Sequence, residues 1–317
     1  EHGGSVLSTT INKYCYITCR RLPPFFEHRS RIVWSKVEHV KTIEEIQHPA
    51  VRESLAFMNV NEGVEIHHDG DLPAKSGLGS SSSFTVGVLN TLYALKGIMP
   101  TKMRLALDAI HVEQDRLKEN VGSQDQISAA FGGFNRIDFR RDGDFQITPM
   151  IFPKDRLQDF QDHLVLFFTG LSRTASEIAA DQIRAISNKV QELNAMHQMV
   201  DESIKILNSG ADLAEFGRLL DENWKLKRSL TPRISTPEID DIYETAMRSG
   251  AIGGKLLGAG GGGIILFFVR PEDQASVKDA LRHLLHIPFS FESSGSQIIF
   301  YDSTAQARVD HPAAAVE

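Results

Sequence analysis

The sequence predicts a two-domain protein that combines β-strands with α-helices, and three observations support this fold class. The chain has 317 residues, a length at which one hydrophobic core usually gives way to two. Strand patterns fill the first 70 residues, whereas amphipathic helical patterns dominate the rest. A polar stretch at 153–162 precedes a new, strongly apolar strand, so we place the boundary there, with domains at 1–155 and 156–303.

Composition and charge are those of an ordinary globular protein, with 41% hydrophobic and 24% charged residues. The formal net charge of -7 argues against a general nucleic-acid-binding protein. No run reaches the roughly 18 apolar residues of a membrane helix. Cys15 and Cys19 have the even spacing that places both on one face of a strand, where they would be small core or half-core residues in a reducing compartment, and a disulfide is the weaker interpretation. We therefore expect a cytoplasmic enzyme with neither a nucleic-acid nor a membrane partner.

The first 70 residues are expected to form four strands and one short helix. Residues rich in β-branched, aromatic or alternating patterns define the strands, and Pro23 and Pro24 interrupt them after the second. Pro49 suits the start of the helix, because proline fits the first helical turn. The strands are expected at 5–11, 14–20, 31–34 and 63–67, and the helix within 43–59.

The next segment, 71–90, is the most distinctive of the chain. Gly77 and Gly79 precede four consecutive serines, 80–83, which lead directly into an apolar helical pattern. Such a loop predicts an anion site, because glycines allow a ligand close to the backbone and the first helical N–H groups are unpaired. A flexible linker is the alternative, but Pro73 and the amphipathic helix that follows make it the weaker interpretation.

A second helix is expected at about 101–119, and it carries an acid in an unusual place. Glu113 lies on the apolar stripe that runs from Ala106 to Leu117, whereas Asp108 and Asp115 project to the other side and are expected to be solvated. A carboxylate on a buried face needs a compensating partner. From the helix alone, a metal ion and a buried salt bridge to an arginine or lysine remain equally open.

A second candidate acid follows a short loop. Ser123 and Gln126 have the spacing of a capping box, which places Asp125 in the first turn of a new helix. An acid there can simply complement the helix dipole. Gly122 before it and Gly132–Gly133 after it mark a tightly turned segment, and this favours a functional role.

The second domain is expected to begin with an apolar strand and continue with helices. A strand near 134–139 and a hairpin turn at 140–144 precede the boundary. Thr174 and Glu177 form a second possible capping box, which would start one long helix reaching to about 207. The remaining elements are expected as a strand at 163–169, helices at 213–226, 237–249 and 271–285, strands at 255–257, 264–269, 289–291 and 297–301, and a disordered tail at 304–317.

Two features of this half are candidates for ligand binding. The basic cluster Lys225, Lys227 and Arg228 ends a predicted helix, where cations suit the dipole but could also hold a phosphate. The run 258–263 contains five glycines and one alanine, more than a simple hairpin turn requires. We expect this second glycine loop to line a ligand.

Together, an anion loop at a helix start, an acid-bearing helix and a distant glycine loop are the parts that phosphoryl transfer requires. The common nucleotide loops do not fit, however. There is no Walker sequence, and Lys75 precedes the glycines instead of following them. The dinucleotide-binding fingerprint does not fit either, because the run 258–263 has its glycine spacing but leads into a strand pattern and not into a helix, and the protein-kinase motifs are missing from the sequence.

The sequence resembles the GHMP small-molecule kinases, named for galactokinase, homoserine kinase, mevalonate kinase and phosphomevalonate kinase. Their P-x-x-x-G-L-G-S-S motif is matched by Pro73 and by 77–81, and their Gly-Ala-Gly-Gly-Gly loop is matched by 258–262. The order and separation of the two motifs make the resemblance specific, and it covers nearly the whole chain. It implies an α+β fold with an N-terminal ATP-binding domain, a ferredoxin-like C-terminal domain and an active site in the cleft between them.

The resemblance also implies roles for individual residues. Ser81 and Glu113 would coordinate Mg²⁺, and Asp125 would orient or deprotonate the acceptor hydroxyl. The family's first motif should precede Glu1, so we expect an N-terminal strand to be missing from the chain, or the basic partner of Asp125 to come from elsewhere. The residues that would surround ATP are Lys75, Ser76, Gly77, Leu78, Gly79, Ser80, Ser81, Ser82 and Ser83 in the first loop, and Gly258, Ala259, Gly260, Gly261 and Gly262 in the second.

Within the family, several stretches are most similar to bacterial kinases of D-glycero-D-manno-heptose 7-phosphate, among them INKYCYIT and LFFTGLSRTASEIA. The implied reaction transfers phosphate from ATP to the anomeric hydroxyl and gives the 1,7-bisphosphate, a step toward nucleotide-activated heptoses for surface polysaccharides. Arg173, Lys227 and Arg228 are the candidates for the phosphate of the sugar, and 34–36 is a candidate contact for adenine. The alternatives are another acceptor, such as fucose, another sugar or phosphomevalonate, and a silent member that only binds a sugar or a nucleotide.

Overall fold

The computed structural model describes residues 3–74, 76–171 and 175–303. Lys75, Arg173, Thr174 and the expected tail at 304–317 lie outside this described part. None of the described helices has the length and apolar character needed to cross a membrane.

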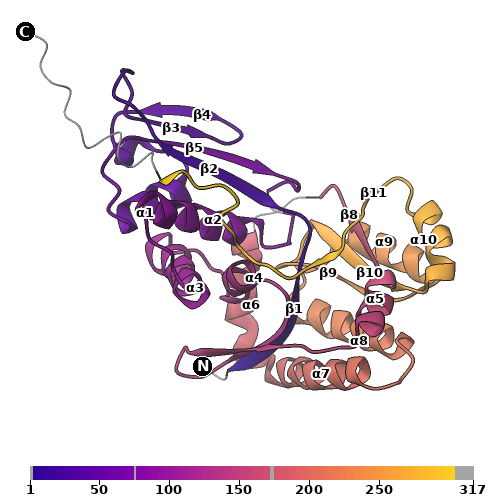
Figure 1. The fold of residues 1–317 in the computed structure, drawn as a ribbon. Coiled ribbons are helices and arrows are strands. Elements are labelled where there is room, and N and C mark those ends of the chain that lie inside the picture. Colours follow the sequence, from indigo (N-terminus) through magenta and orange to yellow (C-terminus); the bar gives the residue numbers. More distant parts are fainter. Residues whose placement is uncertain (1–2, 75, 172–174, 304–317) are drawn as a thin grey trace, which may run out of the picture.

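The first half of the chain forms one four-stranded sheet, three strands of a second sheet and a group of helices (Figure 1). One sheet has the order β2-β5-β3-β4, and α2 packs against β2 on its inner face. The elements are β1 (Gly4–Ile11), β2 (Cys15–Arg21), β3 (Ser30–Val33), β4 (Val37–Val40), α1 (Pro49–Phe57), β5 (Val64–Gly70), α2 (Ser80–Leu95), α3 (Lys102–Ile110), the π-helical turn η2 (His111–Arg116), α4 (Gln124–Phe131), β6 (Phe134–Phe139) and β7 (Phe145–Pro149).

Side chains alternate along β2 as a half-buried strand requires. Cys15, Ile17 and Cys19 pack against the core, while Tyr16 and Thr18 face outward and are exposed. The two cysteines are free thiols, and burial raises the pKa of each to about 12. The prediction that they are small core or half-core residues is confirmed, since both are half-buried against the core.

The second half of the chain forms an antiparallel sheet in the order β11-β8-β10-β9, with α8 and α9 packed on β9. This arrangement of helices and antiparallel strands confirms the α+β class. The elements are α5 (Lys154–Asp162), β8 (Leu164–Phe168), α6 (Ala175–Ala185), α7 (Val190–Asn208), α8 (Ala214–Leu230), α9 (Pro237–Arg248), β9 (Ala251–Leu256), β10 (Ile264–Val269), α10 (Gln274–Ala280), β11 (Leu285–Ile287) and β12 (Phe291–Glu292).

The last described segment returns to the first half of the chain. Residues Phe291 and Glu292 of β12 pair with β1, which places β12 at the edge of the sheet β12-β1-β6-β7. Figure 1 shows this segment, in yellow, running back across α4 and α2, and Asn90 Nδ2 donates to Ser296 Oγ at 3.0 Å. The two halves are therefore joined both by the chain between them and by the segment 291–296, which returns to the first half.

Three sequence predictions about elements are wrong. The long helix expected up to 207 is broken near residues 186–189 into α6 and α7. The polar stretch 153–162, for which no element was predicted, forms α5, whose only buried residue is Phe160, so its pattern carries little signal. The helix expected to 285 ends at Ala280, and no strand forms at 297–301 in the described structure.

Candidate active site

The two glycine loops predicted from the sequence lie against each other. A Cβ atom added to Gly258 would come within 2.7 Å of the Cα of Gly77, and one added to Gly77 would lie 2.9 Å from the carbonyl oxygen of Leu257. Ile264 N also donates to the Ser76 carbonyl at 2.9 Å. Only glycine allows this approach, and both Gly77 and Gly258 have positive φ angles, 83° and 69°. The contact joins the two halves of the molecule where both predicted phosphate loops lie.

Helix α2 begins inside the first loop. Gly79 precedes it in the left-handed conformation, with φ of 66°, and no side chain caps the helix. Its first N–H groups are therefore available to an anion. Ser81 is exposed at this end, whereas Ser82 is buried.

Glu113 is fully buried on the π-helical turn η2. Its carboxylate accepts hydrogen bonds from Ser82 Oγ and Thr85 Oγ1, both at 2.8 Å, and from Gln126 Nε2. Burial raises the pKa of Glu113, although the three hydrogen bonds act in the opposite direction. In the described part of the chain no arginine or lysine is paired with it, so the buried salt bridge that the sequence left open is not formed there.

Asp125 lies in the first turn of α4, as predicted, and next to the start of α2. A Cβ atom on Gly79 would approach Asp125 Cγ to 3.0 Å and Oδ2 to 3.1 Å. Gln124 Nε2 donates to Asp125 Oδ1 at 3.2 Å, and burial raises the pKa of the carboxyl group. The predicted capping box is wrong, because Ser123 Oγ makes no cap bond and instead accepts from Gln114 Nε2 at 3.1 Å.

These residues fit a magnesium ion. Glu113 is a buried carboxylate held by three neutral donors, so its charge is left uncompensated by the described protein. The Ser81 hydroxyl, exposed at the helix start, is a second hard oxygen donor. The described residues contain no cluster of three or more His, Cys, Asp or Glu side chains suited to a metal. A magnesium site usually has only a few protein ligands, because phosphate oxygens and water complete the coordination shell of the ion.

The basic cluster is not gathered around one ligand site. Lys225 Nζ pairs with Asp221 at 2.6 Å and Arg228 with Asp240 at 2.7 Å, both near the surface. Lys227 is buried, and its ammonium donates to two backbone carbonyls at the second glycine loop.

Aromatic rings collect between β3 and the start of α2. Trp34 and Phe84 both contact the ring of His48, with ring centroids 4.9 Å and 4.6 Å from it. Glu38 anchors the group by accepting from Trp34 Nε1 at 2.8 Å and from the His48 amide at 3.2 Å. The sequence singled out Trp34 but missed His48, whose only local signal is that it precedes Pro49.

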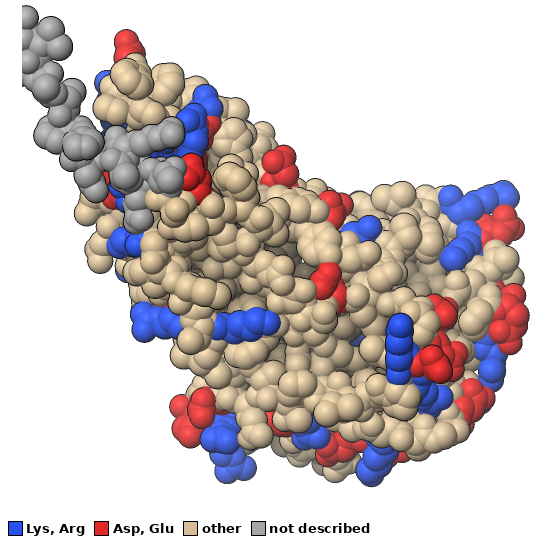
Figure 2. All heavy atoms as spheres, in the orientation of Figure 1, with Lys and Arg blue, Asp and Glu red and all other residues tan. Residues whose placement is uncertain are grey.

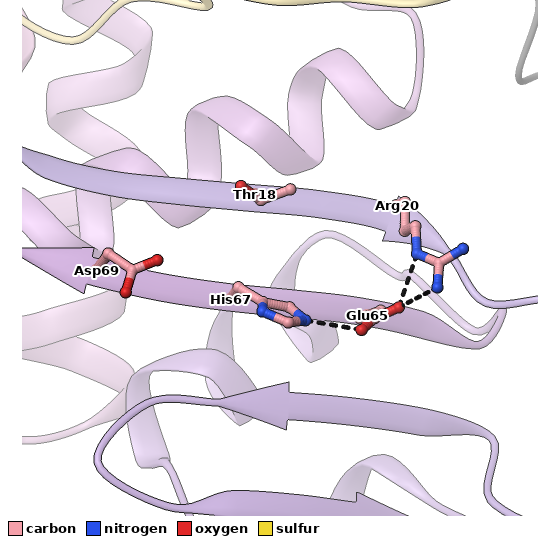
Figure 3. A pocket seen from close by; sticks show the side chains of 5 residues that line it. All are labelled: Thr18, Arg20, Glu65, His67 and Asp69. Carbon is pink, nitrogen blue, oxygen red and sulfur yellow. Dashed lines mark hydrogen bonds and ion pairs between the residues drawn. The ribbon is translucent and has the colours of Figure 1, made fainter.

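A pocket of about 300 Å³ lies elsewhere, on the outer face of the sheet (Figure 3). Glu65, which is 3% exposed, accepts from Arg20 Nε at 2.7 Å and pairs with the nearby Arg31. The two arginines share the single carboxylate of Glu65, and Asp69 adds a second negative charge to the lining, so this pocket carries no excess of positive charge and is a poor phosphate site. Its lining residues come from β2 and β5 and are Thr18, Arg20, Glu65, His67 and Asp69.

Comparison with known proteins matches both halves of the chain to one family. The model of the GHMP kinases N-terminal domain matches residues 39–133, and the model of the GHMP kinases C-terminal domain matches 203–287. Together the two matches cover more than half of the chain.

Individual relatives are similar over most of the chain. A D-glycero-alpha-D-manno-heptose 7-phosphate kinase of Campylobacter jejuni is 31% identical over 219 residues, which are 68% of this chain and 64% of that protein, slightly less than two thirds. A galactokinase of Pyrococcus furiosus is 29% identical over 71% of this chain and 69% of its own length. A crystal structure of a D-glycero-D-manno-heptose 1-phosphate kinase from Bacteroides thetaiotaomicron superposes with a TM-score of 0.75, at 23% identity and with 92% and 89% of the chains covered.

Proposed function

The chain belongs to the GHMP kinases, and on that premise we propose that it transfers the γ-phosphate of ATP to the anomeric hydroxyl of D-glycero-D-manno-heptose 7-phosphate. The observation that carries the proposal is the position of Asp125 beside Gly79, at the start of a helix whose N–H groups can hold phosphates. The heptose is chosen because the relative from Campylobacter jejuni is a heptose 7-phosphate kinase. An enzyme that consumes ATP and a sugar phosphate is expected in the cytoplasm.

The two loops divide the binding of ATP between them. The N-terminus of α2 and the backbone of 76–83 would hold the phosphates, and 258–262 would cover them from the other half of the molecule. Ser81 and Glu113 would hold Mg²⁺, which supplies charge neutralisation of the phosphates. Glu113 is kept in place for this by Ser82, Thr85 and Gln126.

Asp125 would act on the acceptor. Its carboxylate would orient the anomeric hydroxyl and accept its proton at Oδ2 as the oxygen attacks the γ-phosphorus, while the bond from that phosphorus to the bridging oxygen breaks and ADP leaves. Because burial raises the pKa of Asp125, the group is a stronger base at neutral pH than an exposed aspartate. Because Asp125 is close to the phosphate loop, it would place the hydroxyl next to the phosphoryl group that is transferred. Such positioning is a major part of catalysis in phosphoryl transfer.

An ADP-release assay against a panel of acceptors tests the proposal. The panel is heptose 7-phosphate, mannose, fucose, galactose and phosphomevalonate, each assayed with Mg²⁺ and ATP. We expect the highest kcat/KM with the heptose phosphate. Activity confined to galactose or fucose would support the kinase activity but assign a different acceptor sugar. Such a sugar is the second candidate substrate, because one relative is a 29% identical galactokinase. No turnover with any acceptor, despite nucleotide binding, would indicate a silent sugar- or nucleotide-binding member.

A further inference from the structure

Lys227 is a buried cation with an unusual set of partners. It lies on α8, its side chain is 9% exposed, and its Nζ donates to the carbonyl oxygens of Leu256 at 3.0 Å and Gly258 at 2.6 Å. No carboxylate is paired with it in the described part of the chain. Burial without a counter-ion lowers the pKa of Lys227 well below its usual value, so the side chain is held by the hydrogen bonds that its amino group donates and not by an ion pair.

The two carbonyls that Lys227 binds are at the entry to the second glycine loop. Two other carbonyls of this loop are held by side chains in the same way, Ala259 O by Gln182 Nε2 at 2.6 Å and Gly263 O by Thr169 Oγ1 at 2.8 Å. By contrast, the amides of Gly260 and Gly262 have no partner among the described residues. A loop whose carbonyls are tied to the protein and that keeps some of its amides free is suited to an anion, because carbonyl oxygens repel phosphate and N–H groups bind it.

This loop needs external restraint. Gly258 and Gly260 have φ angles of 69° and 123°, and a glycine run of this kind loses much conformational entropy when it is held in one shape. The first residue of this loop also makes the contact between the two halves of the molecule, because Gly258 packs on Gly77 of the first loop. A restraint at Leu256 and Gly258 therefore acts on both loops.

We propose that Lys227 is a positioning residue, whose ammonium fixes the carbonyls of Leu256 and Gly258 so that the glycine loop presents its amides to a nucleotide phosphate. This role replaces the one expected from the sequence, in which Lys227 binds the phosphate of the sugar. Two of its three N–H donors are used by the loop, and burial leaves little access to a ligand. The identity of the nucleotide as ATP rests on the proposed function.

The variant Lys227→Met removes the ammonium and keeps the length of the side chain. Lys225→Met is the matched control, because Lys225 lies on the same helix with a side chain 65% exposed. Hydrogen exchange is measured on the ligand-free protein at the bonded amides of Leu257, Gly261 and Gly263. We expect at least about 10-fold faster exchange at these amides in Lys227→Met and no change in the control. In kinetics, KM for ATP should rise about 10-fold while KM for the acceptor stays within about twofold.

A labelling experiment on the unmodified protein covers the case in which Lys227→Met does not fold. An amine-reactive reagent should modify Lys225 and leave Lys227 unmodified, with or without ligands. Labelling of Lys227 that a sugar phosphate prevents would overturn the proposal and restore the phosphate-binding role, as would unchanged exchange together with a raised acceptor KM. Exchange and labelling need no turnover, so they test Lys227 even if every acceptor in the panel fails.

Discussion

At the scale of single residues, Asp125 is held in a position that favours reactivity over stability. Burial raises its pKa, so the ionised carboxylate is less stable in the folded protein than in the unfolded chain. The protein is therefore destabilised by this group at any pH above the folded pKa. Below the unfolded pKa, near 3.9, the group is neutral in both states and the penalty vanishes.

The variant Asp125→Asn separates these effects. Turnover should fall by about 10²- to 10⁴-fold, the usual contribution of a general base, while ATP binding is retained. The melting temperature should rise at pH 7 and match that of the unmodified protein near pH 3.5, because only the ionised group carries the penalty. Steady-state kinetics and thermal denaturation at the two pH values measure this. Turnover that survives within a few-fold would reduce Asp125 to a helix-start residue.

Two neighbouring serines provide a second test at this scale. Ser81 is exposed at the start of α2, whereas Ser82 is buried and donates to Glu113 at 2.8 Å. Ser81→Ala should raise the Mg²⁺ concentration needed for half-maximal activity with little effect on stability. Ser82→Ala should lower the free energy of unfolding by about 1–2 kcal/mol, because Glu113 loses a buried donor. A magnesium titration and urea denaturation of both variants decide the assignment, and a reversed pattern would make Ser82 the ligand.

At the scale of elements, the helix predicted at 101–119 shows what the sequence can and cannot reveal. Its apolar spacing correctly places Glu113 on the buried face. The change from α3 to a π-helical turn, with Leu117 N bonded to Val112 O at 2.9 Å, is not visible in that pattern. Asp108 was expected in solvent but is 5% exposed, because Tyr93 and Arg104 hydrogen-bond its carboxylate.

The sequence pattern does not reveal which residues distant along the chain contact each other. The strands around both glycine loops have local patterns and were predicted, whereas the partners of Glu113 lie 31, 28 and 13 residues away on other elements. No periodicity within one segment reports such a partner. The break between α6 and α7 was missed for a related reason, since an apolar repeat can continue in sequence across a bend.

Helix α2 offers a test of how firmly Glu113 must be held. Thr85→Val keeps the shape of the side chain and removes a donor to the Glu113 carboxylate. We expect the free energy of unfolding to fall by about 1–3 kcal/mol and kcat/KM to fall by about 10-fold. Thr91→Val is the control, because among the described residues Thr91 Oγ1 bonds only to the Val88 carbonyl on the same helix. Equal kinetic losses in the two variants would show that Thr85 has no special role.

At the scale of the whole molecule, charged side chains of both signs are interspersed over the face drawn in Figure 2. The two halves are held together where their backbones come close to each other at glycines. The return of the chain end is the clearest case. Ser296 N donates to Ala129 O at 2.8 Å, and Lys102 Nζ bridges the carbonyls of Phe131 at 2.6 Å and Ser294 at 3.1 Å. The end of α4, whose first turn carries Asp125, is therefore fixed by a segment from the other end of the chain. The sequence prediction of a strand at 297–301 gave no indication of this.

Gly295 packs closely against Gly132 and its neighbours in that contact. It has φ of 69°, and a Cβ atom there would lie 2.6 Å from Ala130 O and 2.7 Å from Gly132 N. Gly143 has a similar φ of 89° but open space around its Cα, so Gly143→Ala measures the conformational penalty alone, on the order of 1 kcal/mol. Gly295→Ala should cost about 1–3 kcal/mol more, because backbone atoms must move apart, and should lower kcat because α4 shifts with Asp125. Urea denaturation and kinetics of the two variants test this, and equal effects would mean that the chain end only lies on α4 without positioning it.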